Sequence, residues 1–148
     1  MPELFIGSDH RGFELKERLV AELNTSSSYT ISDLGPFAYD PADDYNDAAL
    51  AVARAVASQP DSRGILICGS GNGVCIQANR IKGVRAIAPT IPELARLGRE
   101  HNDANVLCLS ADFLEYNKVA ELSNIFLNTK FSDEERHKRR NHRLDEEV

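Results

Sequence analysis

Residues 64–75, GILICGSGNGVC, combine two thiols with a glycine-rich loop. Gly69, Gly71 and Gly73 permit tight turns, and they let backbone N–H groups approach a ligand closely. Where such N–H groups open a helix, they favour an anion. The loop lacks the Gly-Lys-Ser/Thr of a P-loop and the spacing GxGxxG of a dinucleotide site, so it is not a nucleotide-binding motif. A plain turn between a strand and a helix is the alternative interpretation.

Cys68 is the thiol that this stretch places best for chemistry. It ends the apolar run and precedes the glycines, near the expected start of a helix. A thiolate is stabilised at such a position, so Cys68 is a candidate nucleophile or general base. The alternative is a small core residue, which is what most free cysteines are. Cys75 is expected to line the same pocket, and Cys108 to belong to the core.

Two histidines have polar neighbours. Asp9 and His10 follow an apolar run near the N-terminus, and their place at a strand end favours a functional role over a structural one. His101 and Asn102 end an expected helix, where the histidine is a candidate general acid near neutral pH or a simple helix cap.

Two charged stretches complete the set. Residues 43–47, DDYND, either position a ligand rich in hydroxyls or form an acidic helix start. Arg136 and Arg140 are four residues apart, so they share a helix face that suits one phosphate. A solvated face with intrahelical ion pairs and a short nucleic-acid patch are the alternatives.

Apolar runs alternate with helical patterns along the whole chain, and each run predicts a strand. The five predicted strands cover 3–9, 29–35, 64–69, 84–90 and 105–111. Helices are predicted over 11–23, 47–58, 72–80, after Thr90, over 113–128 and after Ser132. This alternation predicts one α/β domain over residues 1–148, with a parallel sheet covered by helices on both faces. Ligands bind beyond the carboxyl ends of such strands, where Asp9, His10 and Cys68 gather.

Two helix starts carry the pattern of a capping box. Thr90 is followed three residues later by Glu93, and Ser132 is followed by Glu135. In both cases we expect the hydroxyl to accept a backbone N–H at the helix start.

Composition excludes several classes of protein. The 148 residues include 17 basic and 23 acidic side chains, and the net charge of −6 argues against a nucleic-acid binder. Three cysteines without a CxxC argue against a disulfide framework or a thiol redox protein. The N-terminus lacks the pattern of a signal peptide, and no stretch approaches the roughly 20 apolar residues of a membrane span. We therefore expect a cytoplasmic globular protein.

Six stretches occur in an order and at spacings typical of one family. They are IGSDHRGFELKE, DDYNDAALAVA, GILICGSGNGVCIQANR, GVRA, REHNDANVL and RHKRR. Over nearly the whole chain, they resemble the type B ribose-5-phosphate isomerases and the related galactose-6-phosphate isomerase subunits. The resemblance implies a Rossmann-like α/β/α sandwich with a five-stranded sheet and a charged C-terminal helix. It also implies a homodimer with shared active sites, and no metal or organic cofactor.

The same resemblance implies isomerisation of ribose 5-phosphate to ribulose 5-phosphate through a cis-enediolate. An isomerase of another pentose or hexose phosphate, and a sugar-phosphate binder without turnover, are the alternatives. Catalytic roles then fall on Cys68 as base, His101 for ring opening from the partner subunit, Ser70 and Asp9. Substrate contacts fall on His10, Tyr45, Gly69, Gly71, Asn72, Gly73, Asn102, Arg136 and Arg140, with His10 and the two arginines at the phosphate.

The chain departs from the family pattern after its fifth strand. Family members often carry an arginine there that reaches the phosphate, but this chain has Ser110, Ala111 and Asp112. The usual Asp-Tyr-Pro is also replaced by Asp-Tyr-Asn at residues 44–46. An acid in place of a base leaves the identity of the sugar phosphate open.

Overall fold

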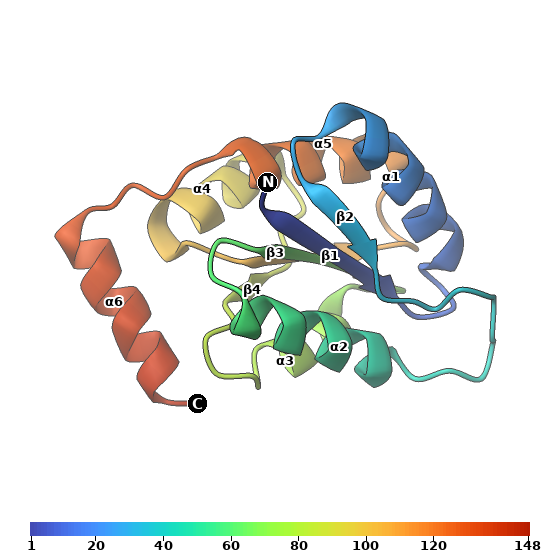
Figure 1. Ribbon diagram of the computed structural model, residues 1–148, viewed down its shortest axis with the longest axis horizontal. Helices are drawn as coiled ribbons and strands as arrows, with labels where there is room; N and C mark the ends of the chain where they lie inside the picture. Colours follow the sequence, from blue (N-terminus) through green and yellow to red (C-terminus); the bar gives the residue numbers. More distant parts are fainter.

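One parallel sheet forms the centre of the computed structural model, which describes all residues Met1–Val148 (Figure 1). Its strand order is β2-β1-β3-β5-β4, and every neighbouring pair is parallel. The strands are β1 (Glu3–Ser8), β2 (Thr30–Asp33), β3 (Arg63–Cys68), β4 (Ala86–Ile87) and β5 (Val106–Ser110). The predicted five-stranded parallel sheet is confirmed.

Helices cover both faces of this sheet. One face carries α1 (Phe13–Ser26), α4 (Pro92–Asn102) and α5 (Tyr116–Asn128), and the other carries α2 (Tyr45–Ser58) and α3 (Asn72–Ala78) (Figure 1). The last helix, α6 (Glu135–Glu146), stands apart from the sandwich, packs against α4 and forms an ion pair between its Asp145 and Arg85. None of the helices combines the length and apolar composition that crossing a membrane requires.

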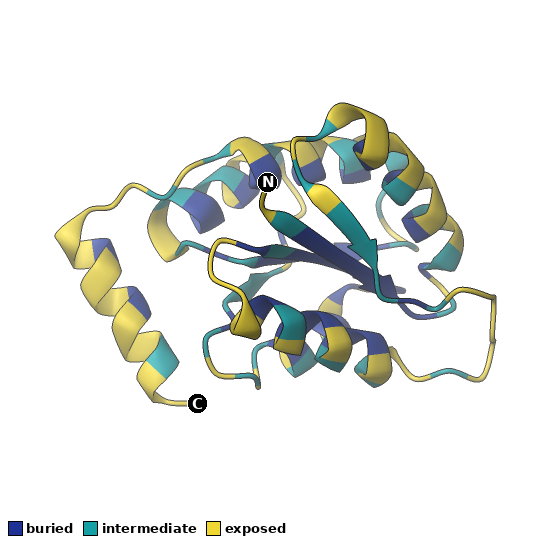
Figure 2. Cartoon of the chain, viewed as in Figure 1, coloured by how far each residue is buried: buried dark blue, intermediate teal, exposed yellow.

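Each face of the sheet has its own apolar core, because successive strand residues point to opposite faces. Ile65 and Ile67 pack with α1, α4 and α5, whereas Leu66 and Cys68 pack with α2 and α3. The central strands are therefore buried on both sides, as parallel strands between two helical layers must be (Figure 2).

The carboxyl ends of β1 and β3 mark the switch point of the sheet. The two strands are neighbours, with Ser8 opposite Ile67. From β1 the chain enters α1 on one face, and from β3 it enters α3 on the other face. Connections that leave in opposite directions open a crevice between the strand ends, which is where ligands bind in such sheets.

The fourth strand is shorter than predicted. It pairs only through Ala86 and Ile87, although the apolar pattern extends over 84–90. Two amide side chains occupy the neighbouring backbone groups, since Asn105 accepts the N–H of Arg85 and Asn79 accepts the N–H of Ala86, both at 2.8 Å. These side-chain bonds take the place of a longer ladder at this edge of the sheet.

The capping box predicted for α4 is wrong. Neither Thr90 nor Glu93 caps the helix, because the N-cap residue is Ile91 and no side chain bonds to the helix start. Pro92 follows as the first helical residue, and proline suits this position because it has no N–H to satisfy.

The capping box predicted for α6 is also wrong. The N-cap is Glu134, and no side chain caps the first turn. The Oγ of Ser132 bonds instead to Nδ1 of His137 at 2.7 Å and accepts the N–H of Glu134 at 3.3 Å. The hydroxyl of Ser132 therefore bonds within the C-terminal segment and does not cap α6.

Candidate active site

A cavity of about 450 Å³ opens at the carboxyl ends of the central strands. It lies where β1, β3 and β5 end and where α2 begins, at the switch point of the sheet. Nine residues line it: Asp9, Arg11, Tyr45, Cys68, Gly69, Ser70, Gly73, Asp112 and Phe113. The structure thus brings together three of the sequence-predicted strand ends and the glycine-rich loop.

Cys68 ends β3 at the inner wall of this cavity and is 5% exposed. Its Sγ accepts the backbone N–H of Gly71 at 3.2 Å. Gly71 has φ = 83°, and a Cβ at this residue would lie 3.2 Å from the carbonyl carbon of Leu109. Only glycine adopts this positive φ easily and also avoids the contact with Leu109. Glycine at this position therefore lets the backbone N–H point toward the sulfur. Such a donor favours a sulfur that carries negative charge.

The rest of the loop shapes the mouth of the cavity. Ser70 is exposed, and its Oγ accepts the N–H of Asn72 at 3.1 Å. A Cβ at Gly73 would lie 2.7 Å from the ring of Tyr45, so the absence of a side chain lets that ring pack against the loop. Tyr45 therefore lines the cavity beside the loop.

The end of β1 contributes two fixed polar groups. Asp9 is buried, and its Oδ1 accepts the N–H of Gly12 at 3.1 Å. His10 lies beside the cavity rather than in its lining, with Nδ1 2.7 Å from Oδ1 of Asp43. The same carboxylate accepts the backbone N–H of His10 at 3.0 Å. This pairing fixes the imidazole ring and leaves Nε2 free to meet an anion.

Asp112 is neutralised by a residue that sequence reasoning missed. The guanidinium group of Arg11 bonds to Oδ2 of Asp112, and the pair covers Gly69. A Cβ at Gly69 would lie 2.8 Å from Nε of Arg11 and 3.0 Å from Oδ2 of Asp112. The turn after β1 therefore places a cation at the cavity, beside the acid that follows β5. The only sequence signal for Arg11 was its place directly after Asp9 and His10.

Cys75 does not line this cavity, so that expectation is wrong. Its Sγ lies 3.5 Å from the carbonyl oxygen of Ala86, on the sheet side of α3. A hydrogen bond from Cys108 lowers the pKa of Cys75, and burial raises the pKa of Cys108. Cys108 is buried in the core, as expected.

The remaining predicted residues lie at the other end of the molecule. Because α4 runs back from the carboxyl edge to the amino edge of the sheet, His101 and Asn102 lie at the opposite edge from Cys68. Arg136 and Arg140 belong to α6, beyond that same edge. Figure 1 shows α6 at the left, whereas the strand arrows point to the right. One chain therefore does not unite the two halves of the predicted site.

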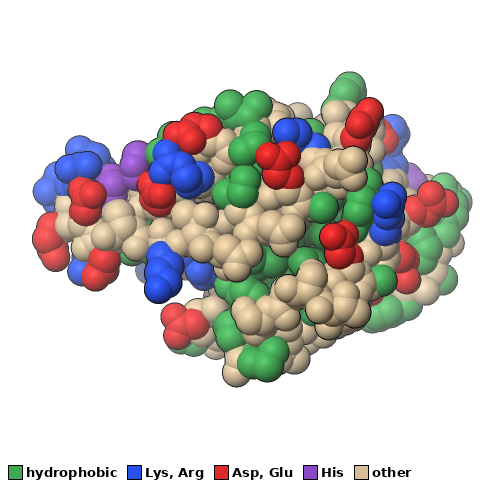
Figure 3. Space-filling model, turned by 90° about the horizontal axis from the view of Figure 1, so that it is seen from above, with side chains coloured by type: hydrophobic (Ala, Val, Ile, Leu, Met, Phe, Trp, Pro, Cys, Tyr) green, Lys and Arg blue, Asp and Glu red, His purple; other side chains and the backbone are tan.

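The second half is organised around a pair of stacked histidines. The rings of His101 and His137 lie 4.4 Å apart, and Nδ2 of Asn141 donates to the carbonyl oxygen of His101 at 3.0 Å. Burial and the neighbouring His101 lower the pKa of His137. Arg136 pairs with Glu134 at 3.0 Å. Lys, Arg and His side chains gather among acidic ones on α6, at the left of Figure 3, so this end offers cations to an anion.

Comparison with known proteins gives a consistent result. A family model described as Ribose/Galactose Isomerase matches residues 4–144. A probable ribose-5-phosphate isomerase B from Mycoplasma pneumoniae is 43% identical over 128 residues, which cover 86% of this chain and 84% of that protein. The ribose-5-phosphate isomerase B of Mycolicibacterium paratuberculosis is 39% identical over 93% of this chain and 86% of its own.

Solved structures agree with the sequence comparisons. A crystal structure of ribose-5-phosphate isomerase B from Mycoplasma genitalium, with bound ribulose-5-phosphate, superposes with a TM-score of 0.92 at 40% identity. The match covers 98% of this chain and 95% of that one. The Thermotoga maritima enzyme superposes with a TM-score of 0.91 at 36% identity, over 98% of both chains. The fold, the family model and the relatives agree, and the chain belongs to the ribose/galactose isomerase family.

Proposed function

We propose that this chain interconverts ribose 5-phosphate and ribulose 5-phosphate. The observation that carries the proposal is the thiol of Cys68, which lines the cavity together with Asp9 and Tyr45 and accepts the N–H of Gly71. Relatives that match most of the chain are named ribose-5-phosphate isomerase B, and one of them was solved with bound ribulose-5-phosphate. A thiol, a carboxylate and a tyrosine around one cavity suit a polyhydroxylated substrate.

The proton transfer uses Cys68 as the base. Its thiolate removes the proton from C2 of the open-chain aldose, and the electrons of that bond move to form the cis-enediolate. The thiol then returns the proton to C1. The proton of the C2 hydroxyl passes to the C1 oxygen, so C1 becomes the alcohol and C2 becomes the ketone. Negative charge develops on the enediolate oxygens, where the N–H groups of residues 69–73 can stabilise it. One such donor contributes about 10²–10³ in rate in other enzymes.

Ring opening and phosphate binding need a second chain. We assign ring opening to His101 of the partner subunit, with Asn102 of the partner subunit beside it. His10 holds the phosphate from the first chain through its free Nε2, and Arg136 and Arg140 of the partner subunit complete the phosphate site. The opposite placement of the two halves in one chain supports a homodimer with two shared sites. We place this enzyme in the cytoplasm, and a further pairing of dimers is compatible with this assignment.

Mixing two inactive variants tests the shared site. A Cys68→Ala chain and a His101→Ala chain should each lack turnover. Unfolded together, refolded and assayed, equal amounts should regain about a quarter of wild-type activity, because half of the dimers then hold one intact site. Each variant refolded alone is the control. A mixture as inactive as its components would contradict a site shared between chains.

A substrate series separates the enzyme from a binder and identifies the sugar. Turnover of pentose 5-phosphates and hexose 6-phosphates should be followed with a coupled assay, and binding of the same compounds by calorimetry. We expect turnover with ribose 5-phosphate to exceed turnover with any hexose phosphate. Binding of ribose 5-phosphate without product would show a sugar-phosphate binder instead. Asp112 does not favour that outcome, because Arg11 already balances its charge.

A further inference from the structure

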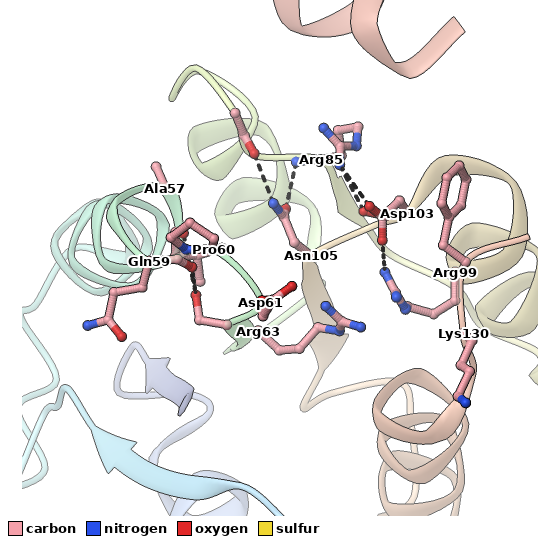
Figure 4. Close-up of a pocket in the computed structure, with 14 residues that line it drawn as sticks. Ala57, Gln59, Pro60, Asp61, Arg63, Arg85, Arg99, Asp103, Asn105 and Lys130 are labelled. Carbon is pink, nitrogen blue, oxygen red and sulfur yellow. Dashed lines mark hydrogen bonds and ion pairs between the residues drawn. The ribbon is translucent and has the colours of Figure 1, made fainter. Parts of the chain in front are cut away.

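A second cavity, of about 460 Å³, lies at the opposite edge of the sheet from Cys68. It opens where β3 and β5 begin, between α4 and the segment that follows α5 (Figure 4). Its lining is mostly polar. The charged members are the cations Arg63, Arg85, Arg99 and Lys130 and the carboxylates Asp61 and Asp103. Positive side chains therefore outnumber negative ones in a cavity that the isomerase mechanism does not use.

Arg63 is a cation of this cavity that has no partner within the chain. Its side chain is partly buried, and its guanidinium group makes no hydrogen bond and no ion pair with any other residue. The Nε atom in particular is buried without an acceptor. The guanidinium group lies 6.0 Å from the centre of the Phe126 ring. This cation–π contact involves the face of the group and leaves its N–H donors without an acceptor. Buried donors without an acceptor are costly and point to an absent partner.

Arg99 adds a second guanidinium group to the same place. It is 2% exposed and lies 5.9 Å from the same Phe126 ring. Figure 4 shows Arg63 and Arg99 pointing toward each other across the cavity. Burial and the charge of Arg63 lower the pKa of Arg99, which is the effect of two like charges in a poorly solvated place.

The acids nearby do not balance these two cations. Asp103 bonds to Nη1 of Arg99 at 2.8 Å, but it also lies 3.6 Å from Arg85. Backbone carbonyl oxygens accept from Nη1 and Nε of Arg99 at 2.6 and 3.1 Å, so Nη2 is the nitrogen of Arg99 that keeps free donors. Asp61 lines the cavity and forms no ion pair with Arg63. Lys130 stands at the exposed rim and also has no carboxylate partner. An unpaired guanidinium group, a half-compensated one and a free ammonium group therefore share one cavity.

We propose that this cavity binds a small oxyanion of the phosphate class, held by Arg63 and Arg99 with Lys130 at the rim. The guanidinium group of Arg63 presents paired N–H donors that match two phosphate oxygens, and the free Nη2 of Arg99 approaches the same ion from the other side. The volume admits inorganic phosphate or a small phosphate monoester. This cavity has no lining residue in common with the cavity of Cys68, and none of the residues assigned to catalysis or substrate binding lines it.

Calorimetric titration of the whole protein with inorganic phosphate tests the site. The wild-type chain should bind phosphate at two sites, the catalytic one and this one. Arg63→Gln should weaken one of them at least about tenfold and leave the KM for ribose 5-phosphate unchanged. Arg54→Gln is the matched control, because this substitution removes the same charge. Arg54 is an exposed residue of α2 and lies outside the cavity. A phosphate isotherm of Arg63→Gln equal to that of the control would overturn the proposal.

Four further measurements test the same site. In NMR spectra of the wild type, the Nε–H signal of Arg63 should shift on addition of phosphate, and an unchanged signal would contradict the site. Lys130→Gln, a milder change at the rim, should weaken the same binding about threefold even if Arg63→Gln folds poorly. Glycerol phosphate in place of phosphate distinguishes a monoester from the free ion. A change in oligomeric mass of Arg63→Gln with unchanged phosphate binding would mean that a second chain covers the cavity, and the proposal would fail.

Discussion

The backbone N–H of Gly71 donates to Sγ of Cys68 over 3.2 Å. This bond joins the glycine-rich loop to the thiol at the end of β3. The left-handed backbone of Gly71 turns its N–H back toward the sulfur, so the position of the sulfur and the conformation of the loop depend on each other.

Replacing the thiol should remove turnover and retain binding. Cys68→Ser keeps the size of the side chain but offers a far weaker base, so kcat should fall by about 10²–10⁴. Calorimetry should show ribose 5-phosphate binding within a few-fold of the wild type. Cys75→Ala is the control and should retain kcat within about twofold, because Cys75 lies outside the cavity. Near-normal turnover of Cys68→Ser would rule out the assigned base.

A methyl group at Gly71 should damage the site as well as the fold. Gly71→Ala places a Cβ at φ = 83° and 3.2 Å from Leu109, and the strain should lower the free energy of unfolding by about 1–2 kcal/mol. The turn must shift, so the N–H moves away from the sulfur and kcat falls as well. Gly83→Ala is the matched control, since its φ is 87° and nothing lies within 4 Å of its Cβ. It should lose similar stability and keep its kcat, and equal kcat values in the two variants would contradict this reasoning.

Because Arg11 and Asp112 form an ion pair, we expect substitutions of the two residues to have opposite effects on KM. Arg11→Gln leaves a carboxylate facing an anionic substrate, so KM should rise about fivefold. Asp112→Asn releases the guanidinium group toward the substrate, so KM should fall by a similar factor. The double variant should return close to the wild type, and all the differences should shrink at high salt, because the pair is partly exposed. Changes of KM in the same direction would show that the pair acts through the fold and not through charge.

Docking of α6 should weaken in mild acid. Burial lowers the pKa of His137 below its ordinary value of 6.5, so the unfolded segment takes up a proton first as the pH falls. The stability that neutral His137 contributes is therefore complete above pH 6.5 and is lost as the pH falls toward its lowered pKa. Hydrogen exchange of α6 amides should speed up over this range. In His137→Gln this acceleration should be smaller, and an identical pH profile would remove His137 as the cause.

The sequence predicted the sheet and its reactive edge because both depend on local patterns. Cys68 follows a buried run, and a buried run in a parallel sheet must end at the edge where ligands bind. Ser132 was misassigned because its hydroxyl bonds to His137, a contact that competes with the capping pattern. Arg11 was missed because its partner, Asp112, lies 101 residues away in the chain.

The prediction that Cys75 lines the pocket was wrong for a different reason. The short helix α3 offers Val74, Cys75 and Ala78 as adjacent small apolar side chains, and periodicity does not decide which of them faces the sheet. Packing decides it, with Val74 and Ala78 fully buried and Cys75 turned toward Ala86.

Because Cys68 and His101 lie at opposite edges of the sheet, folding of the chain and formation of the proposed site are separate steps. Folding brings the strands into register within one molecule, so its rate should not depend on protein concentration. A site that needs both residues forms only when two folded molecules meet, so recovery of activity after dilution from denaturant should be a second-order process. Secondary structure should return first, and newly made protein should pass through a folded stage that does not yet isomerise sugar.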